Sequence, residues 1–337
     1  MPTRPTMNDV ARIADVSLKT VSRVVNREPN VRPETEERVH QAISELGFRR
    51  NDAARSLRQR HKPRTLGLVI GDVGNPFYSA IARGVEQVLR RRGMLLITGS
   101  SDEDPDLERD LIRELLERRV DGLIVATAAT DHRYLLPDMA HGVAVVFIDR
   151  PPGRIEADTI LLDNAGGVGA AVEHLLGLGH QRIGFIGDLT TIFTAGERLR
   201  GYRAALAAHG VAEDPALVHL GSHSVESAGL ALRELLELAE PPTAMLTGNN
   251  RITIGALTEL ARSHAELALV GFDDLELADL LGRPLTAVAY DAEEFGRRAA
   301  ALAVRRLDGD DGPPEQLMEP TSLVVRASSR APNRATR

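Results

Sequence analysis

Two groups of residues in this chain have types and spacings suited to recognising another molecule. The first is segment 17–26, in which valines at helical spacing form one side and a mostly polar set points elsewhere: Leu18, Lys19, Ser22, Arg23 and Asn26. The second is a pair of phenylalanines, Phe77 and Phe193, each of which follows an apolar run. Their rings can stack on a flat ligand or on a sugar ring, with packing in the core as the alternative.

Residue combinations typical of catalysis are not found in the sequence. It has no cysteine, no Gly-x-Ser-x-Gly motif and no phosphate-binding loop, and its histidines show no metal-ligand pairing. The acidic stretch 102–106 precedes an expected helix over Leu107–Arg118, and we interpret it as a solvated cap rather than a metal site. We therefore expect no enzymatic activity, no metal and no cofactor.

Charge is distributed unevenly along the 337 residues. Residues 1–64 hold 14 Lys and Arg against 8 Asp and Glu, whereas residues 65–337 hold 27 against 40. This asymmetry suggests that the basic segment meets a polyanion, the alternative being a chance cluster. No apolar run approaches the roughly 18 residues of a membrane span, and the first twelve residues lack the apolar centre of a signal peptide. We expect a soluble, cytoplasmic protein with no membrane partner.

The basic segment is expected to begin with a small all-α unit, residues 1–50. Apolar residues recur at helical spacing in three stretches, which predicts helices over Asn8–Ala14, over Ser17–Asn26 and from Pro33 to Gly47. Proline is favoured at a first helical position, and glycine is favoured just after a last turn. Two short helices joined by a tight turn form a helix-turn-helix.

Residues 51–64 are expected to form a hinge and a linker. Asn51 can cap a short helix over Asp52–Arg58, which is too short to be stable alone. Three more basic side chains and Pro63 follow, a composition typical of linkers. A domain boundary is therefore expected near residue 64.

From Thr65 onward, short apolar runs alternate with amphipathic stretches, which is typical of parallel sheets covered by helices. The predicted strands are Leu66–Ile70, Met94–Thr98, Gly122–Ala126, Ala144–Ile148, Ile160–Leu162, Ile183–Gly187, Ala244–Thr247, Leu267–Phe272 and Ala287–Ala289. The sequence 66–72 is echoed at 183–188. We predict an α/β core over 65–330 with two lobes, about 65–162 and 163–291, and a C-terminal segment that crosses back. Because ligands of open α/β sheets bind at the carboxyl ends of the strands, the cleft between the lobes is the expected pocket.

Motifs along nearly the whole chain, from about Thr6 to Val325, resemble one family. They are Met7–Ala11, Val16–Asn26, Gly74–Tyr78, Val120–Ile124, Phe147–Arg150, Asp163–Gly167, Gly179–Ile186, Arg198–Tyr202 and Val270–Asp274. In this order they resemble the lactose-repressor (LacI/GalR) family of bacterial transcription regulators. The resemblance implies a periplasmic-binding-protein-like core and a homodimer on a double-stranded DNA operator with approximate twofold symmetry. It also implies a repressor controlled by a small-molecule effector.

The resemblance assigns DNA-binding roles to eleven residues. The residues expected to contact base edges are Leu18, Lys19 and Arg23. Those expected to contact the DNA backbone or to cap helices are Thr6, Ser17, Thr20, Ser22 and Asn26. The residues expected to act in the hinge are Asn51, Arg55 and Leu57. Ser17 fits a simple helix cap equally well, and Leu57 is either a wedge in the minor groove or a leucine packed on the core.

The resemblance also assigns effector binding to polar residues near the expected cleft. They are Asp149, Arg150, Arg198, Asn249 and Asp273. Phe77 and Phe193 are predicted to bind the effector as well. Carboxylate, amide and guanidinium groups suit ligand hydroxyls, so a sugar-like effector is expected, with intralobe salt bridges as the alternative for any one residue.

The sequence departs from the family pattern at a few positions. Arg32 and Arg50 stand where a small capping residue and a proline are common. At the cleft, Tyr290 replaces part of a glutamine-containing segment. Arg251 adds a guanidinium there, which predicts either an effector with negative charge or an ion pair with a neighbouring acid.

Two other functional classes were weighed against a regulator. An enzyme is disfavoured by the missing catalytic motifs, and a free-standing sugar receptor by the basic helical segment. The tail beyond Val325 lacks a leucine heptad, so no tail-mediated tetramer is expected.

Overall fold

The computed structural model describes residues 5–25, 28–29, 31–48 and 64–330. The chain divides into two compact units, residues 1–63 and residues 64–337, which we call the headpiece and the core. Within the described residues, no helix has the length and apolar character needed to cross a membrane.

The described residues of the headpiece form three helices: α1 (Met7–Ile13), α2 (Leu18–Val25) and α3 (Pro33–Leu46). Their apolar faces meet in one cluster, with Val10, Ala14, Val21, Val24, Val39 and Ala42 buried. Thr6 and Asp9 form a capping box before α1. Gly47 ends α3 with φ +60°, a left-handed conformation that glycine adopts without strain. The predicted helices are confirmed to within a residue or two, except that Asn26 and the expected helix at 52–58 lie outside the described residues.

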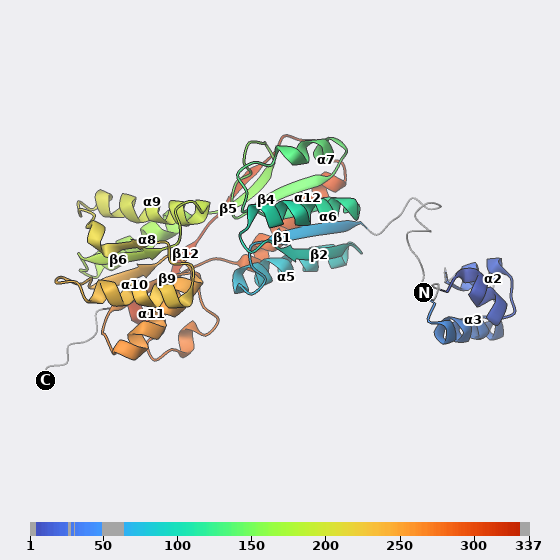
Figure 1. Cartoon of the computed structure of the whole chain (residues 1–337), viewed down its shortest axis with the longest axis horizontal. Helices are drawn as coiled ribbons and strands as arrows, with labels where there is room; N and C mark the ends of the chain where they lie inside the picture. Colours follow the sequence, from blue (N-terminus) through green and yellow to red (C-terminus); the bar gives the residue numbers. More distant parts are fainter. Residues whose placement is uncertain (1–4, 26–27, 30, 49–63, 331–337) are drawn as a thin grey trace. The chain divides into compact units, whose positions relative to one another are not determined.

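The core has two lobes, each built on a six-stranded sheet with helices on both faces (Figure 1). The first lobe orders its strands β11-β5-β4-β3-β1-β2, all parallel. They are β1 (Thr65–Ile70), β2 (Leu95–Ser100), β3 (Gly122–Ala126), β4 (Ala144–Ile148), β5 (Asp158–Leu162) and β11 (Gln316–Glu319). Its helices are α5 (Pro76–Arg91), α6 (Pro105–Glu117), α7 (Leu136–Ala140) and α12 (Ala292–Leu307).

The second lobe orders its strands β12-β10-β9-β8-β6-β7, and only β12 runs antiparallel to its neighbour. They are β6 (Ile183–Gly187), β7 (Val218–Leu220), β8 (Ala244–Thr247), β9 (Ala268–Phe272), β10 (Thr286–Ala289) and β12 (Ser322–Val324). Its helices are α8 (Asn164–Gly177), α9 (Phe193–Ala208), α10 (Val225–Leu236) and α11 (Asn250–Ser263). The predicted α/β fold class is confirmed.

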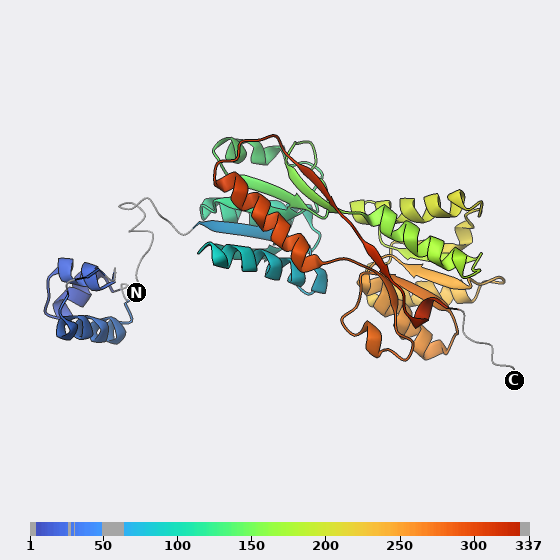
Figure 2. The same ribbon diagram turned by 180° about the vertical axis from the view of Figure 1, so that it is seen from behind.

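The chain passes between the lobes three times: after β5, after β10 and after β11. Figure 2 shows the last crossing, where the C-terminal segment leaves the first sheet at β11 and joins the second at β12. Three strands, β7, β11 and β12, were not predicted. They are short edge strands whose side chains, apart from Glu319, are exposed or half-exposed, so they lack the continuous apolar run that reveals a central strand.

Candidate functional site

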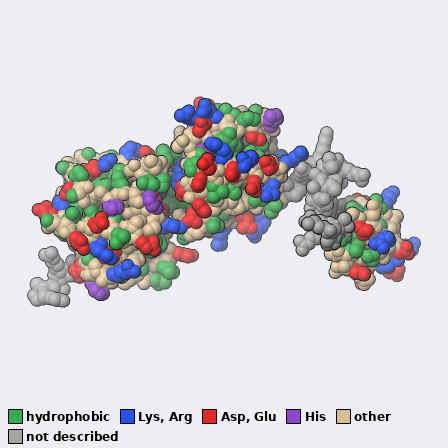
Figure 3. All heavy atoms as spheres, in the orientation of Figure 1, with side chains coloured by type: hydrophobic (Ala, Val, Ile, Leu, Met, Phe, Trp, Pro, Cys, Tyr) green, Lys and Arg blue, Asp and Glu red, His purple; other side chains and the backbone are tan. Residues whose placement is uncertain are grey.

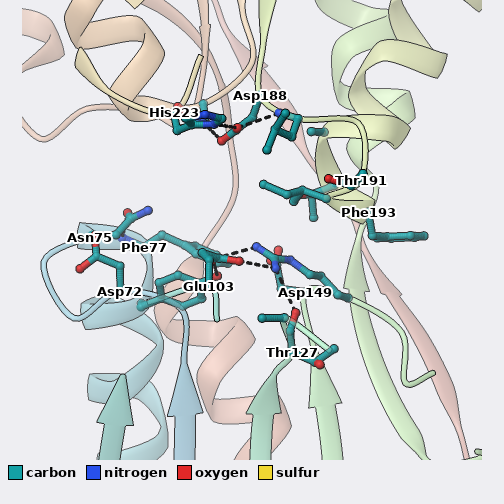
Figure 4. A pocket seen from close by; sticks show the side chains of 18 of the residues that line it. Asp72, Asn75, Phe77, Glu103, Thr127, Asp149, Asp188, Thr191, Phe193 and His223 are labelled. Carbon is teal, nitrogen blue, oxygen red and sulfur yellow. Dashed lines mark hydrogen bonds and ion pairs between the residues drawn. The ribbon is translucent and has the colours of Figure 1, made fainter. Parts of the chain in front are cut away.

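A cavity of about 1020 Å³ lies between the two lobes of the core. Its walls are loops that follow the carboxyl ends of parallel strands, as expected for open α/β sheets. The structure brings all seven residues predicted for effector binding to this cavity: Phe77, Asp149, Arg150, Phe193, Arg198, Asn249 and Asp273. Figure 4 shows Phe77, Glu103, Asp149 and Thr127 gathered over the first-lobe strands, with Asp188 and His223 on the opposite side.

Asp149 follows β4 in a left-handed conformation, with φ +66°. Its backbone N–H donates to Ile160 O at 2.9 Å, which fixes this turn against β5. The side chain is almost fully buried, and its nearest cation is Arg150, with 3.6 Å between Nε and Asp149 Oδ2. Burial raises the pKa of the Asp149 carboxyl above its usual value, against the opposing effect of Arg150 and Arg198. This carboxylate is therefore placed to accept hydrogen bonds from a ligand.

Arg150 forms an intralobe ion pair, the alternative noted from the sequence. Its Nη1 and Nη2 donate to the two carboxylate oxygens of Glu103 at 2.5 and 2.9 Å. Nη1 also donates to Thr127 O at 3.0 Å, whereas the buried Nε has no hydrogen-bond partner among the described residues. Two of the three guanidinium nitrogens are thus occupied by the protein.

Asp273 is one of two second-lobe carboxylates that line the cavity, the other being Asp188. Asp273 follows β9 with φ +72°, accepts a hydrogen bond from Tyr290 Oη at 2.6 Å and accepts another from Asn250 N at 3.0 Å. Burial, and then the neighbouring Asp273 carboxylate, raise the pKa of Tyr290 well above its ordinary value. Tyr290 therefore stays a neutral donor that orients Asp273.

Arg198, on α9, is only 8% exposed and forms no ion pair within the described part of the chain. Nε donates to Asn164 Oδ1 at 2.8 Å and Nη1 donates to Gly248 O at 2.7 Å. The guanidinium carbon lies 3.8 Å from the centroid of the Phe272 ring, a cation–π contact. These neutral contacts hold the side chain while its charge remains available to a ligand.

Asn249 has a structural role as well as a place in the cavity wall. Its Oδ1 accepts from Ile252 N at 2.9 Å and thereby caps α11. The neighbouring Asn250 is more deeply buried and donates from Nδ2 to Asn75 Oδ1 in the opposite lobe at 2.8 Å. Arg251 pairs with Asp72 across the same gap. Of the two explanations for Arg251, the structure shows the ion pair with a neighbouring acid.

The two predicted aromatic residues differ in how far they belong to the core. Phe77 lines the cavity but also packs edge-on against Tyr290, with 5.6 Å between ring centroids, and on the first-lobe core. Phe193, the first residue of α9, is half-buried in the cavity wall. The structure thus shows core packing for Phe77, and its place in the cavity wall leaves stacking on a ligand as a prediction.

Sequence reasoning missed Glu103 as a cavity residue, although residues 102–106 are exposed and precede α6, as the interpretation of a solvated cap predicts. Asp104 does cap α6, since its side chain accepts from Asp106 N and Leu107 N. Glu103, however, turns toward the cavity and binds Arg150. Its position directly after a strand was the available signal, but a nearby cap gave the acidic stretch a sufficient local explanation.

The headpiece presents a second candidate site on α2. Leu18, Lys19 and Arg23 are exposed, whereas Val21 and Val24 are buried, which matches the two sides predicted from the sequence. Ser17 accepts from Thr20 N at 3.1 Å, so the capping role is present. Arg23 lies 4.0 Å from Glu28. Thr6, Thr20 and Ser22 are described, but Asn26, Asn51, Arg55 and Leu57 lie outside the described residues.

Surface charge on the core is mixed. Figure 3 shows acidic and basic side chains interspersed over the visible faces of both lobes. No group of three or more His, Cys, Asp or Glu suited to a metal ion occurs among the residues that the structure describes.

Comparisons with known proteins cover both the headpiece and the core. Residues 6–51 match the bacterial regulatory proteins of the lacI family, and residues 172–329 match a periplasmic binding protein-like domain. The HTH-type transcriptional repressor CytR of Escherichia coli K12 is 30% identical, over 98% of this chain and 97% of its own length.

Two solved structures extend the similarity to the fold. The lac repressor dimer bound to operator and the anti-inducer ONPF has a TM-score of 0.81 at 26% identity, covering 98% of this chain and all of that one. The CelR–cellobiose complex has a TM-score of 0.70 at 32% identity, covering 96% and 100%. The chain therefore belongs to the LacI family of bacterial, DNA-binding transcription regulators, which are not enzymes.

Proposed function

We propose that this protein is a dimeric repressor that binds a DNA operator of approximate twofold symmetry and is controlled by a neutral, sugar-like effector in the core cavity. Residues 1–50 would form the DNA-binding headpiece, 51–64 the hinge and 65–330 the effector-binding and dimerisation core. Because such a repressor binds chromosomal DNA, it would be located in the cytoplasm.

The observation that carries the effector half is the cavity itself. It combines a buried carboxylate of one lobe, Asp149, and a half-buried carboxylate of the other, Asp273, with the Arg198 guanidinium and the Phe77 and Phe193 rings. Acceptors, a donor and apolar faces in one enclosed space suit hydroxyl groups on a ring. Cellobiose in the structure of the relative CelR supports a sugar.

The observation that carries the DNA half is the exposed side of α2. Arg23 and Lys19 can donate to guanine acceptors in a major groove, and Leu18 offers an apolar contact. Thr6, Ser17, Thr20, Ser22 and Asn26 would fix the register through the DNA backbone or by capping. The operator in the structure of the related lac repressor dimer supports this arrangement.

Coupling between the two sites would run through the lobes. An effector that binds one lobe arrangement better than another shifts the equilibrium between them, and so alters affinity for the operator. In the hinge, Asn51, Arg55 and Leu57 would transmit the change at the DNA, with Leu57 as a minor-groove wedge.

The test of the DNA half selects the operator from random DNA and then compares Arg23→Ala with Arg38→Ala. Both lose one exposed positive charge, but Arg38 is on α3. Arg23→Ala should lose about 1–3 kcal/mol on the selected site and little on random DNA. Arg38→Ala should either weaken binding to the selected site and to random DNA equally or leave both unchanged. A selected site occupied by one subunit would contradict the dimer.

The test of the effector half screens the full chain by thermal shift against sugars and polyols, because a ligand specific to the folded state raises its apparent stability. Any ligand found is then added to a gel shift with the operator. Arg198→Ala should remove both responses yet bind the operator when no ligand is present. A ligand that stabilises the protein without changing operator affinity would contradict the proposed coupling.

A further inference from the structure

Glu103 makes a two-point contact with Arg150 at the edge of the cavity. Its Oε1 and Oε2 accept from Nη2 and Nη1, respectively, which is the fork geometry that arginine uses for carboxylates and phosphates. Tyr78 Oη adds a long contact of 3.5 Å to Oε1. A side chain of the protein therefore sits where an anionic group of a ligand would sit.

The local backbone is arranged around this carboxylate. Asp102 and Glu103 both adopt left-handed conformations, with φ +49° and +61°, which are uncommon for residues other than glycine. A Cβ on Gly71 would lie 2.2 Å from Glu103 Oε1, so the glycine leaves room for the carboxylate in its present position. Two unusual features of the chain thus serve the position of one side chain.

The other arginines of the cavity are also held by the protein. Arg251 pairs with Asp72, and Arg198 is held in position by neutral contacts with Asn164 and Gly248 that leave its charge without an acidic partner among the described residues. Among the described residues that line the cavity, the acidic side chains are Asp72, Asp102, Glu103, Asp149, Asp188 and Asp273, against three arginines. An anionic ligand would meet this acidic surplus as well as an occupied fork.

We propose that Glu103 determines effector specificity: it occupies the Arg150 fork and so excludes phosphorylated and carboxylated ligands from the cavity. This inference deepens the proposed function and rests on the cavity being the effector site. Removal of Glu103 should turn the same cavity into an anion site, because Arg150 is only 12% exposed and its charge would lack its closest partner.

The experiment measures thermal shifts of the full chain with inorganic phosphate, at ionic strength matched with sodium chloride. Wild type should show no saturable shift. Glu103→Ala should bind phosphate about tenfold tighter or more, since a charge-assisted contact is gained. The matched control is Glu117→Ala, which removes an exposed carboxylate at the end of α6. Glu103→Ala/Arg150→Ala should lose the gain.

Two further variants keep the test decisive. Glu103→Gln retains the size of the side chain, and it should give a smaller gain because its amide oxygen can still accept from Arg150. Glu103→Ala/Asp149→Asn prevents Asp149, 3.6 Å from Arg150 Nε, from taking the vacated place. Equal phosphate binding by wild type and Glu103→Ala, or no gain in any folded variant, would overturn the inference. Because phosphate reports on Arg150 directly, this result is independent of whether any effector controls the operator.

Discussion

The two lobes use the same backbone device at the cavity and surround it with different chemistry. Asp149 and Asp273 each follow a central strand in a left-handed conformation, and each donates its N–H to the next strand, to Ile160 O and Val288 O. Around Asp149 the partners are charged, namely Arg150 and beyond it Glu103. Around Asp273 they are neutral: a tyrosine hydroxyl and a backbone N–H.

This difference shows that the position of each carboxylate and the charges around it are determined by different parts of the chain. The strand end fixes where the carboxylate lies, whereas its neighbours decide how readily it loses its proton and what it can bind. The first lobe should therefore carry most of the dependence on pH and salt, and the second lobe most of the directional hydrogen bonding.

The largest expected effect is that of Arg150→Ala. It leaves the buried Asp149 carboxylate without its nearest cation, at a cost of about 3 kcal/mol in the free energy of unfolding, measured with urea. Adding Asp149→Asn should restore part of this loss. In the second lobe, Arg198→Ala should cost about 2 kcal/mol through unpaired neutral groups, and Asp273→Asn should restore none of it. If Asp149→Asn and Asp273→Asn restored stability equally, the difference between a charged environment in the first lobe and a neutral one in the second would be contradicted.

The second prediction concerns pH. Because the pKa of Asp149 is raised in the folded protein, its carboxyl favours folding at low pH, and this contribution is lost as pH rises through the raised value. Asp149→Asn should therefore melt higher than wild type at neutral pH, with an advantage that disappears in acid.

Its partner variant sharpens the contrast. Asp273→Asn should be less stable by about 1–2 kcal/mol, since one side-chain oxygen is lost from its contacts with Tyr290 and Asn250. Melting temperatures across pH measure both variants. An Asp149→Asn variant less stable than wild type at neutral pH would contradict the ionic description of the first lobe.

The smallest expected effect is on the two contacts between the lobes, Arg251 with Asp72 and Asn250 with Asn75. Arg251 and Asp72 are 47% and 31% exposed, so Arg251→Ala should cost at most about 1 kcal/mol, and added salt should abolish the difference. Asn250→Ala should cost more, because it removes a buried hydrogen bond to Asn75. If urea unfolding showed a larger loss of stability for Arg251→Ala than for Asn250→Ala, the ion pair would be the stronger contact between the lobes.

Central elements of the fold were predictable from the sequence. Strands such as Gly122–Ala126 and Ala144–Ile148 match their predicted bounds, because a strand buried on both faces needs an uninterrupted apolar run. Pro33 and Gly47 marked α3 through backbone geometry. Three of the four edge strands, β7, β11 and β12, were not predicted, since an exposed face removes that signal, whereas the edge strand β2 was predicted from its apolar start.

For the candidate sites, the sequence by itself determined which residue types follow each strand and which sides of α2 are apolar and polar. The strand pattern predicted a cleft at the carboxyl ends of the strands, and the resemblance to a family assigned Asp149, Arg198 and Asp273 to it. Only the tertiary structure decided the pairing: Glu103 with Arg150, Tyr290 with Asp273, and Arg251 with Asp72. These pairs join residues 17 to 179 positions apart, and such contacts depend on side-chain directions that local sequence patterns do not encode.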